Sequence, residues 1–246
     1  MYKATGWGDA YPRYSAQNNK STRQANSWTQ ANPVYLLSDK ATIWAYYPYN
    51  QSVTDGTRIP VPVNAGTPID YMWGKSTNQV SVVETDARIP MKHALSQLVV
   101  RLKVSPEYHN DGNLTSARLK SSSAKFATTG TMNLNDGGKI TFSPTTTELS
   151  WAPNTTVPAQ GQQAVDFAAA VYPMTLASGE VTLEVVIDGA TYTYSIPQIT
   201  WEAGKRYIYS ITMRSNNAEI GGSNGQSVTI EGWTSTESDI TLVPVK

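Results

Sequence analysis

Alternation of apolar and polar residues with a period of two is the most regular feature of this chain. Between residues 98 and 104, Val99, Arg101 and Lys103 fall on one side of an extended segment, and Leu98, Val100, Leu102 and Val104 fall on the other. This is the pattern of a half-buried strand, in which the arginine and the lysine are expected to face water. No segment keeps a helical period of 3.6 residues for long. The pattern therefore predicts an all-β fold.

A second alternating region predicts a β-hairpin and a further strand. Residues 181–187 and 191–196 both alternate, and Asp188-Gly189 stands between them. An Asp-Gly pair between two alternating runs is a strong indication of a two-residue hairpin turn. Another alternating run begins at Gly204-Lys205 and extends to Arg214. Three consecutive strands are therefore expected here.

The N-terminal third of the chain is less regular. Residues 41–49 are interpreted as a strand that ends at Pro48, because proline is tolerated only at an edge or at a strand end, and residues 59–63 are a second short candidate. Residues 1–33 hold few apolar positions, so much of that segment is expected to be loop or an edge covering. A polar, turn-rich region gives way to the alternating run near residues 84–90. We therefore predict two domains, residues 1–88 and 89–246.

Composition excludes several classes of function. The 246 residues include 19 basic and 19 acidic side chains, so no net positive charge is available to bind nucleic acid. The chain has no cysteine, which excludes disulfides, zinc-finger ligand sets and a thiol nucleophile. No stretch approaches the roughly 20 apolar residues of a membrane helix, and the first residues do not resemble a signal peptide. We therefore expect a cytosolic protein or one whose targeting segment has been removed.

Three candidate chemical motifs are better explained as structure. Residues 221–225 match the G-x-S-x-G nucleophile pattern, but no helical segment follows them and both histidines, His93 and His109, precede them, so we interpret them as a loop. The two histidines lack metal-ligand spacing. Residues 110–112 and 135–138 offer oxygen ligands for calcium but do not fit the EF-hand series, and we interpret both as hairpin turns. We therefore predict no catalytic residue, no metal site and no cofactor.

Aromatic residues of the N-terminal third allow two interpretations. They could form a platform that stacks against sugars, or they could be sandwich core and cross-strand pairs, which we prefer. The residues concerned are Trp44, Tyr46, Tyr47, Tyr49, Tyr71 and Trp73. A two-carboxylate glycosidase is possible on paper with 19 acidic residues, but nothing singles out a pair.

Several motifs, read in order, resemble one known family. The first three are Ala45-Tyr46-Tyr47-Pro48-Tyr49, Asp70-Tyr71-Met72-Trp73-Gly74 and Met91-Lys92-His93-Ala94-Leu95-Ser96-Gln97-Leu98. Further downstream come Val171-Tyr172-Pro173-Met174, the Asp188-Gly189 hairpin, residues 203–209 and Gly232-Trp233. Their order and spacing resemble the fimbrillin family of Bacteroidetes-type pilins, over roughly residues 35–235.

This resemblance implies a fold, a location and a type of assembly. It implies two tandem transthyretin-like (immunoglobulin-like) β-sandwich domains, export as a lipoprotein to the outer-membrane surface, assembly into an extracellular fimbrium, and no enzyme activity. In such pilins a protease removes the N-terminal strand, and a strand of another subunit fills the groove that is left. The chain has no lipobox cysteine and lacks the first strand region, so we expect a processed form. Nothing marks Arg13 or Arg23 as the cleavage site.

The C-terminal segment, residues 240–246, is the predicted donor strand. Ile240 and Leu242 are expected to enter successive pockets of a neighbouring subunit, with Val243 and Val245 on the alternate face. Pairing of this strand within its own domain is an equally open alternative. We therefore predict a structural pilin that polymerises by donor-strand exchange and supports adhesion, with other pilin subunits, including anchor and tip subunits, as partners. The alternatives are a tip or accessory adhesin and a surface glycan-binding lipoprotein module, with a host glycan or protein as ligand.

Overall fold

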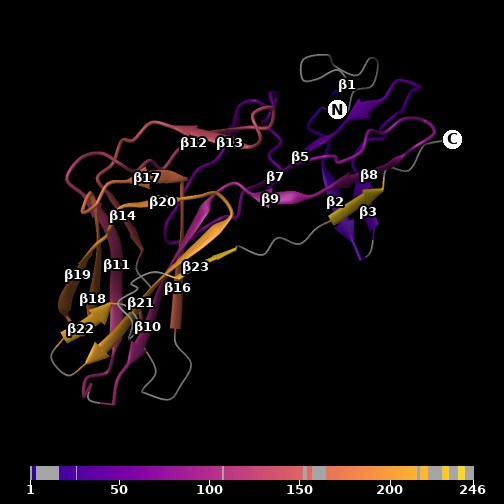
Figure 1. Cartoon of the computed structure of the whole chain (residues 1–246). Coiled ribbons are helices and arrows are strands. Elements are labelled where there is room, and N and C mark those ends of the chain that lie inside the picture. The colour runs from indigo at the N-terminus through magenta and orange to yellow at the C-terminus, as the bar shows by residue number, and fades with distance from the viewer. Residues whose placement is uncertain are drawn as a thin grey trace.

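The structure is a computed structural model that describes residues 2–3, 17–25, 27–106, 108–151, 154–156, 165–214, 217–220, 229–232 and 238–241. All secondary-structure elements of the described residues are β-strands. No helix long and apolar enough to cross a membrane occurs among these residues. The all-β class predicted from the alternation is therefore confirmed. The strands form an elongated, bent molecule with one group at the lower left and another at the upper right (Figure 1).

The larger group, which we call the main sandwich, consists of two five-stranded sheets. The first sheet contains β16 (Val165–Val171), β10 (Ser96–Val104), β21 (Lys205–Arg214), β22 (Asn217–Ile220) and β23 (Thr229–Gly232). The second contains β14 (Glu148–Trp151), β15 (Thr155–Thr156), β11 (Asn113–Ser121), β18 (Val181–Ile187) and β19 (Ala190–Ser195). β10 and β21 run parallel, whereas the other strand pairs of the main sandwich are antiparallel.

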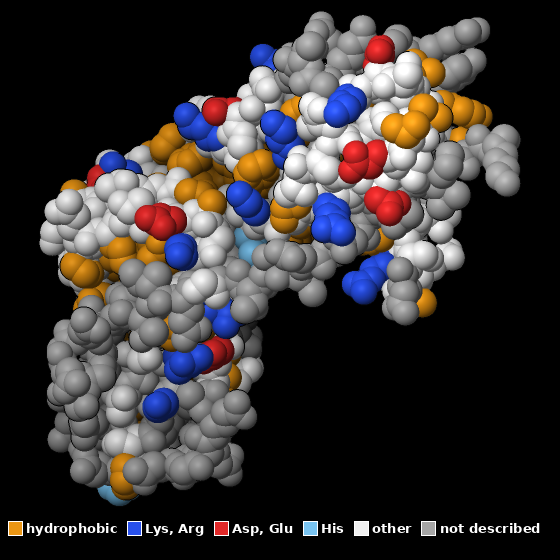
Figure 2. All heavy atoms as spheres, turned by 45° about the vertical axis from the view of Figure 1, so that its right-hand side comes forward, with side chains coloured by type: hydrophobic (Ala, Val, Ile, Leu, Met, Phe, Trp, Pro, Cys, Tyr) orange, Lys and Arg blue, Asp and Glu red, His pale blue; other side chains and the backbone are white. Residues whose placement is uncertain are grey.

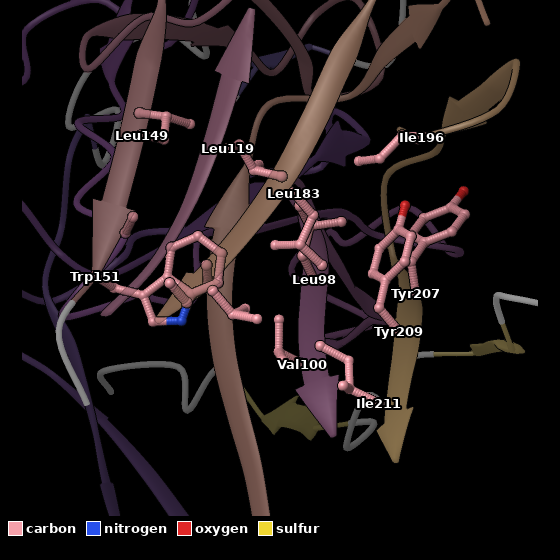
Figure 3. Packing of buried hydrophobic residues seen from close by; sticks show 14 of the residues in the cluster. Leu98, Val100, Leu119, Leu149, Trp151, Leu183, Ile196, Tyr207, Tyr209 and Ile211 are labelled. Carbon is pink, nitrogen blue, oxygen red and sulfur yellow. The ribbon is translucent and has the colours of Figure 1, made fainter. Parts of the chain in front are cut away.

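The apolar positions of the two sheets meet in one core. Leu98 and Val100 of β10 point toward Leu183 of β18, and the aromatic rings of β21 line the same interior (Figure 3). The predicted inward side of residues 98–102 is confirmed, because Leu98, Val100 and Leu102 are buried. Val99 is buried as well, on the other side. Arg101 does not simply face water, because its guanidinium forms two 2.7 Å bonds with Asp166 of the neighbouring strand β16.

A second core cluster, which we call the connecting cluster and which includes Ile59, Tyr71, Met132 and Tyr172, joins the two groups of strands. It lies beside a three-stranded sheet of β6 (Ile59–Pro60), β12 (Gly130–Asn133) and β13 (Lys139–Phe142), and near the pair β17 (Met174–Leu176) and β20 (Ile199–Trp201). Buried Tyr172 donates a hydrogen bond to the carbonyl oxygen of Val61, and its ring stacks on Phe142 with centroids 4.6 Å apart. Segments from both sides of residue 88 thus share one cluster, and the boundary between residues 88 and 89 stays a prediction.

The upper-right group, which we call the N-terminal group, is built from short strands. Its three-stranded sheet contains β5 (Trp44–Tyr47), β7 (Met72–Lys75) and β9 (Met91–His93). Three pairs complete it: β1 (Tyr2–Lys3) with β4 (Ala41–Thr42), β2 (Ser21–Gln24) with β3 (Ser27–Gln30), and β8 (Asp86–Ile89) with β24 (Ser238–Thr241). The β2–β3 hairpin is more structure than its polar sequence led us to expect. The predicted strand 41–49 is observed as β4 and β5.

The pairing of the flanking strands distinguishes the correct turn predictions from the wrong one. Asp188 and Gly189 have φ angles of 49° and 77° and connect the paired residues Ile187 and Ala190, so the two-residue hairpin is confirmed. Residues 135–138 connect the antiparallel strands β12 and β13, as predicted. The hairpin predicted at residues 110–112 is wrong, because the flanking strands β10 and β11 belong to different sheets.

Candidate functional site

Strand β8 is the place where the C-terminal segment meets the N-terminal group. Its burial alternates, with Ala87 and Ile89 almost completely buried and Asp86 and Arg88 exposed. Ala87 and Ile89 belong to a third core cluster together with Val34, Ala41 and Val80. One face of β8 is therefore fixed to the core, and its register cannot slip by one residue without exposing that face.

The two edges of β8 have different partners. Along one edge, the Thr77 amide donates to the Arg88 carbonyl oxygen at 2.9 Å. The side chain of Asn78 bonds there too, donating to the Asp86 carbonyl oxygen at 2.6 Å and accepting from the Arg88 amide at 3.0 Å. Alternate residues of a strand direct their backbone groups to opposite edges. The backbone groups of Ala87 and Ile89 therefore face the other edge, which β24 covers.

The structure gives a defined register for the predicted donor segment. β24 is antiparallel to β8, and the four paired positions are Ser238 with Ile89, Asp239 with Arg88, Ile240 with Ala87 and Thr241 with Asp86. Ile240 is thus the register partner of a core residue. Leu242, Val243 and Val245 lie outside the described residues. Residues 238–241 thus pair with the N-terminal group and not with the main sandwich.

Exposed apolar side chains lie close to β8 in the sequence and in space. Ser81 and Glu84 exchange backbone hydrogen bonds around a turn whose tip is Val82 and Val83, with exposed fractions of 53% and 90%. The Val82 amide donates to the carbonyl oxygen of Leu37, which is also exposed. Figure 2 shows hydrophobic side chains grouped on the upper-right end of the molecule. A turn tip made of two valines is unusual, because turns favour Gly, Asn and Asp.

The six aromatic residues of the sequence analysis are divided between core and surface. Tyr71 is buried, and Trp44, Tyr46 and Trp73 are half-buried against the connecting cluster. Tyr47 and Tyr49 are exposed. The preferred core interpretation is therefore correct for Tyr71, whereas Trp44, Tyr46 and Trp73 pack against the core and also remain partly exposed. Burial raises the pKa of Tyr46, although the Asn50 amide, which donates to the Tyr46 hydroxyl oxygen at 3.3 Å, acts in the opposite direction.

The titratable residues of the other candidate motifs do not converge. His93 is buried in β9, and its Nδ1 lies 2.8 Å from an Asp70 carboxylate oxygen, which ties β9 to the start of β7. His109 is exposed in the loop between β10 and β11. Residues 221–225 lie outside the described residues. Among the residues that the structure describes, no three His, Asp or Glu side chains are placed to hold a metal ion.

Comparison with known proteins points to one family. The sequence model of the fimbrillin-like family matches residues 1–233. A Bacteroides uniformis protein, provisionally named fimbrium subunit Fim1C, is 22% identical over 92% of this chain and 78% of its own length.

Solved structures show the same fold. A cell adhesion protein of Bacteroides ovatus, provisionally so described, superposes with a TM-score of 0.62 and 19% identity over 85% of this chain and 76% of its own. A cell adhesion protein of Bacteroides uniformis, also provisionally so described, superposes with a TM-score of 0.62 and 20% identity over 87% of this chain and 79% of its own. A fimbrial protein of Bacteroides vulgatus has a TM-score of 0.54 and 17% identity over 89% and 85%.

Proposed function

The chain belongs to the fimbrillin-like family, and from this premise we propose that it is a structural subunit of a cell-surface fimbrium that supports adhesion. The fimbrial name of its relative Fim1C and the shared fold of the Bacteroides structures support this role. The proposal includes tandem transthyretin-like sandwiches, export as a lipoprotein, and proteolytic processing at the outer-membrane surface. It also includes assembly with anchor and tip subunits, and no enzymatic step.

The proposed mode of polymerisation is an exchange of β24 between copies of the chain. In the isolated chain, Thr77 and Asn78 bond to one edge of β8, and β24 covers the other edge. The same antiparallel register can form when β24 comes from a neighbouring subunit, because an edge strand recognises the backbone of the incoming strand. Exchange of an identical element between protomers is a low-cost route to assembly. Ile240 and Leu242 then occupy pockets of the neighbour, and Val243 and Val245 lie on the alternate face.

One observation carries this proposal: after β23 of the main sandwich, the chain returns to the N-terminal group, where β24 pairs with β8, about 150 residues earlier in the sequence. A strand that already crosses between the two groups needs only to cross to the next molecule. The exposed tip of Val82 and Val83 beside β8 offers apolar surface that such a contact would bury.

The absence of native cysteine makes disulfide trapping a clean test. Arg88 and Asp239 are directly opposite, and their pair lacks mutual backbone hydrogen bonds, because the Arg88 backbone groups bond to Thr77 and Asn78. Such pairs have Cα atoms about 4.5 Å apart, a separation that a disulfide spans. Chains carrying only Arg88→Cys and chains carrying only Asp239→Cys are unfolded together, refolded as a mixture and oxidised.

Strand exchange predicts covalent dimers in this mixture and ladders from the double variant. A mixture of Arg88→Cys and Ile240→Cys chains is the matched control, since its cysteines are one residue out of register and lie on opposite faces. The proposal is wrong if the double variant closes only within one chain and the mixture yields no more dimer than the control.

A further inference from the structure

One face of the β5–β7–β9 sheet collects aromatic rings and lysines. The register pairs Trp44 with Lys75, Tyr46 with Trp73, and Trp73 with Lys92. Residues that lie directly opposite in antiparallel strands share a face of the sheet. These five positions therefore form a continuous band across the three strands. Neighbouring strands are about 4.8 Å apart, so adjacent members of the band can contact one extended ligand.

Each of three lysines in this region holds its ammonium group over an aromatic ring. The Nζ atom lies 5.3 Å from the ring centroid of Trp44 for Lys75, 5.5 Å from that of Trp73 for Lys92, and 5.8 Å from that of Tyr49 for Lys20. Ammonium groups within about 6 Å of a centroid are attracted by the negative face of the ring. We call these six residues the lysine–aromatic surface.

Segment 18–20 extends the band beyond the sheet. The Tyr46 hydroxyl donates to the Asn18 side-chain oxygen, and the Asn18 amide donates to the Asn50 carbonyl oxygen at 2.9 Å. Lys20, two residues further on, is thereby brought over Tyr49. The third lysine–ring pair is thus joined to the other two through Tyr46.

The positive charge of this surface is not compensated locally. All three lysines are exposed, and in the described part of the chain no carboxylate lies within 4.0 Å of their ammonium groups. The adjoining turn carries one carboxylate, Asp136, which is 4.0 Å from Lys139 of its own hairpin. In the main sandwich, by contrast, Lys120 pairs with Glu184 at 2.8 Å. The lysine–aromatic surface therefore presents three cations that an incoming anion can reach.

The rings are held in place by packing beneath them. Trp44 and Trp73 lie half-buried against the connecting cluster. A Cβ atom added at Gly138 would lie 2.2 Å from two atoms of the Trp73 indole, so the Gly138 backbone is in direct contact with that ring. Rings that are fixed before a ligand arrives lose little conformational entropy when it binds.

We propose that the lysine–aromatic surface binds an anionic polysaccharide, with the lysines contacting carboxylate or sulfate groups and the rings contacting the sugar faces. The negative face of an aromatic ring attracts the C–H groups of a sugar as it attracts a cation. An exposed cation–π contact is weak, whereas a charge-assisted bond from lysine to an anion is stronger. Each lysine ammonium group is therefore expected to move from its ring to an anionic group of the ligand, and this movement exposes the face of the ring to the sugar.

A purely covering role is the competing explanation, in which each lysine stem shields an aromatic face from water. The two explanations differ in what they require of the charge. Covering needs only the methylene stem, which glutamine partly retains, whereas binding of an anion needs the ammonium group. Lys75→Gln/Lys92→Gln thus separates them, with a melting curve to show that the fold is kept.

The test titrates the full chain with four polymers of similar length: dextran sulfate, polygalacturonate, unmodified dextran and poly-L-glutamate. Tryptophan fluorescence is recorded together with calorimetry, because Trp44 and Trp73 lie on the surface and attraction of charge elsewhere would leave their emission unchanged. We expect the chain to bind dextran sulfate and polygalacturonate with a change in tryptophan emission. We expect it to bind unmodified dextran at least about tenfold more weakly than either acidic polysaccharide. The double variant is expected to bind them about tenfold more weakly, from two exposed ionic contacts.

The matched control is Lys103→Gln/Lys205→Gln in the main sandwich, which is expected to change affinity less than about twofold. Equal binding of poly-L-glutamate would assign the surface to acidic polypeptides and overturn the proposal. Equal binding by the two double variants, or no binding of either acidic polysaccharide, would also overturn it. The lysine–aromatic surface contains no residue of β8 or β24, so binding can be measured on the monomeric fraction of the protein. A failure of the strand-exchange proposal would therefore not affect the result of this test.

Discussion

Asp188 connects the hairpin of β18 and β19 to the loop that leads into β11. Its carboxylate accepts hydrogen bonds from the Tyr108 hydroxyl, from the Gly112 amide at 2.9 Å and from the Asn113 amide at 2.8 Å. The Asp188 amide in turn donates to the Asn113 carbonyl oxygen at 2.9 Å. This one residue therefore holds the loop and the hairpin turn together, and its removal should weaken that end of the main sandwich.

The size of the effect follows from the bonds that each substitution removes. Tyr108 is 8% exposed, so water cannot freely replace its bond to the carboxylate. A hydrogen bond to a charged group contributes about 1.5–3 kcal/mol, and we expect Tyr108→Phe to lower the free energy of unfolding by about 2 kcal/mol. Asp188→Asn keeps a side chain that tolerates the φ angle of 49° but removes the charge from three bonds, with an expected loss of about 3 kcal/mol.

The pH dependence of this contact has a definite sign at each end. Burial, assisted by the bond to Asp188, raises the pKa of Tyr108 to about 12, so its contribution is present below the ordinary value of 10.0 and is lost as the pH rises towards 12. Burial acts to raise the pKa of Asp188, but the three hydrogen bonds outweigh it and hold that pKa below 3.8. The contribution of Asp188 is present above pH 3.8 and is lost as the pH falls through the lower, folded-state value.

Urea denaturation followed by tryptophan fluorescence measures the two single variants and the double variant. A double-mutant cycle is expected to give a coupling energy of at least about 1 kcal/mol between Tyr108 and Asp188, because Tyr108→Phe removes the bond whose charge Asp188→Asn removes. Tyr47→Phe is the matched control, since that exposed residue should change stability by no more than about 0.5 kcal/mol. Additive losses, or a Tyr108→Phe variant as stable as the control, would refute the reasoning.

Two further substitutions test close packing and charge. Gly138→Ala is expected to cost at least about 2 kcal/mol more than Gly137→Ala, because both residues have a positive φ but a Cβ at Gly138 meets Trp73 at 2.2 Å, against 3.7 Å for Gly137; equal melting temperatures would contradict this. Glu184→Gln is expected to lose about 1 kcal/mol at neutral pH. The hydrogen bond from Lys120, against the opposing effect of burial, holds the Glu184 pKa below 4.5, so the difference from the original chain should vanish as the pH falls through that lower value; a difference that persists in acid would contradict it.

Local patterns in the sequence predicted the elements whose partners are close along the chain. The β18–β19 hairpin follows from alternation and one Asp-Gly turn, and the inward side of β10 follows from period two alone. The turn at residues 110–112 was misjudged because composition alone does not reveal whether the next strand returns to the same sheet.

The edge of β8 that β24 covers was not found from the sequence. Its only indication is four alternating residues, Asp86–Ile89, and the partners on its two edges come from residues 77–78 and from β24. A pairing over about 150 residues depends on tertiary structure that no local window contains. The lysine–aromatic surface could not be predicted for the same reason. The strand pattern places Trp44 and Trp73 on one face of the sheet, but only the tertiary structure brings Lys20 over Tyr49.

The distance between β8 and β24 along the chain also sets the order in which the molecule can be completed. During synthesis, β8 is made long before β24, so the edge of β8 that β24 covers lacks this partner until residues 238–241 have been made. Pairing of residues so far apart requires closure of a very long loop, which slows folding. The pairing of β8 with β24 is therefore expected to form late, and under the proposed exchange it is the step at which a strand of a neighbouring subunit can replace β24. Under the proposed exchange, the time for which this edge of β8 stays uncovered, as well as the affinity of the strands, determines how often a chain joins another.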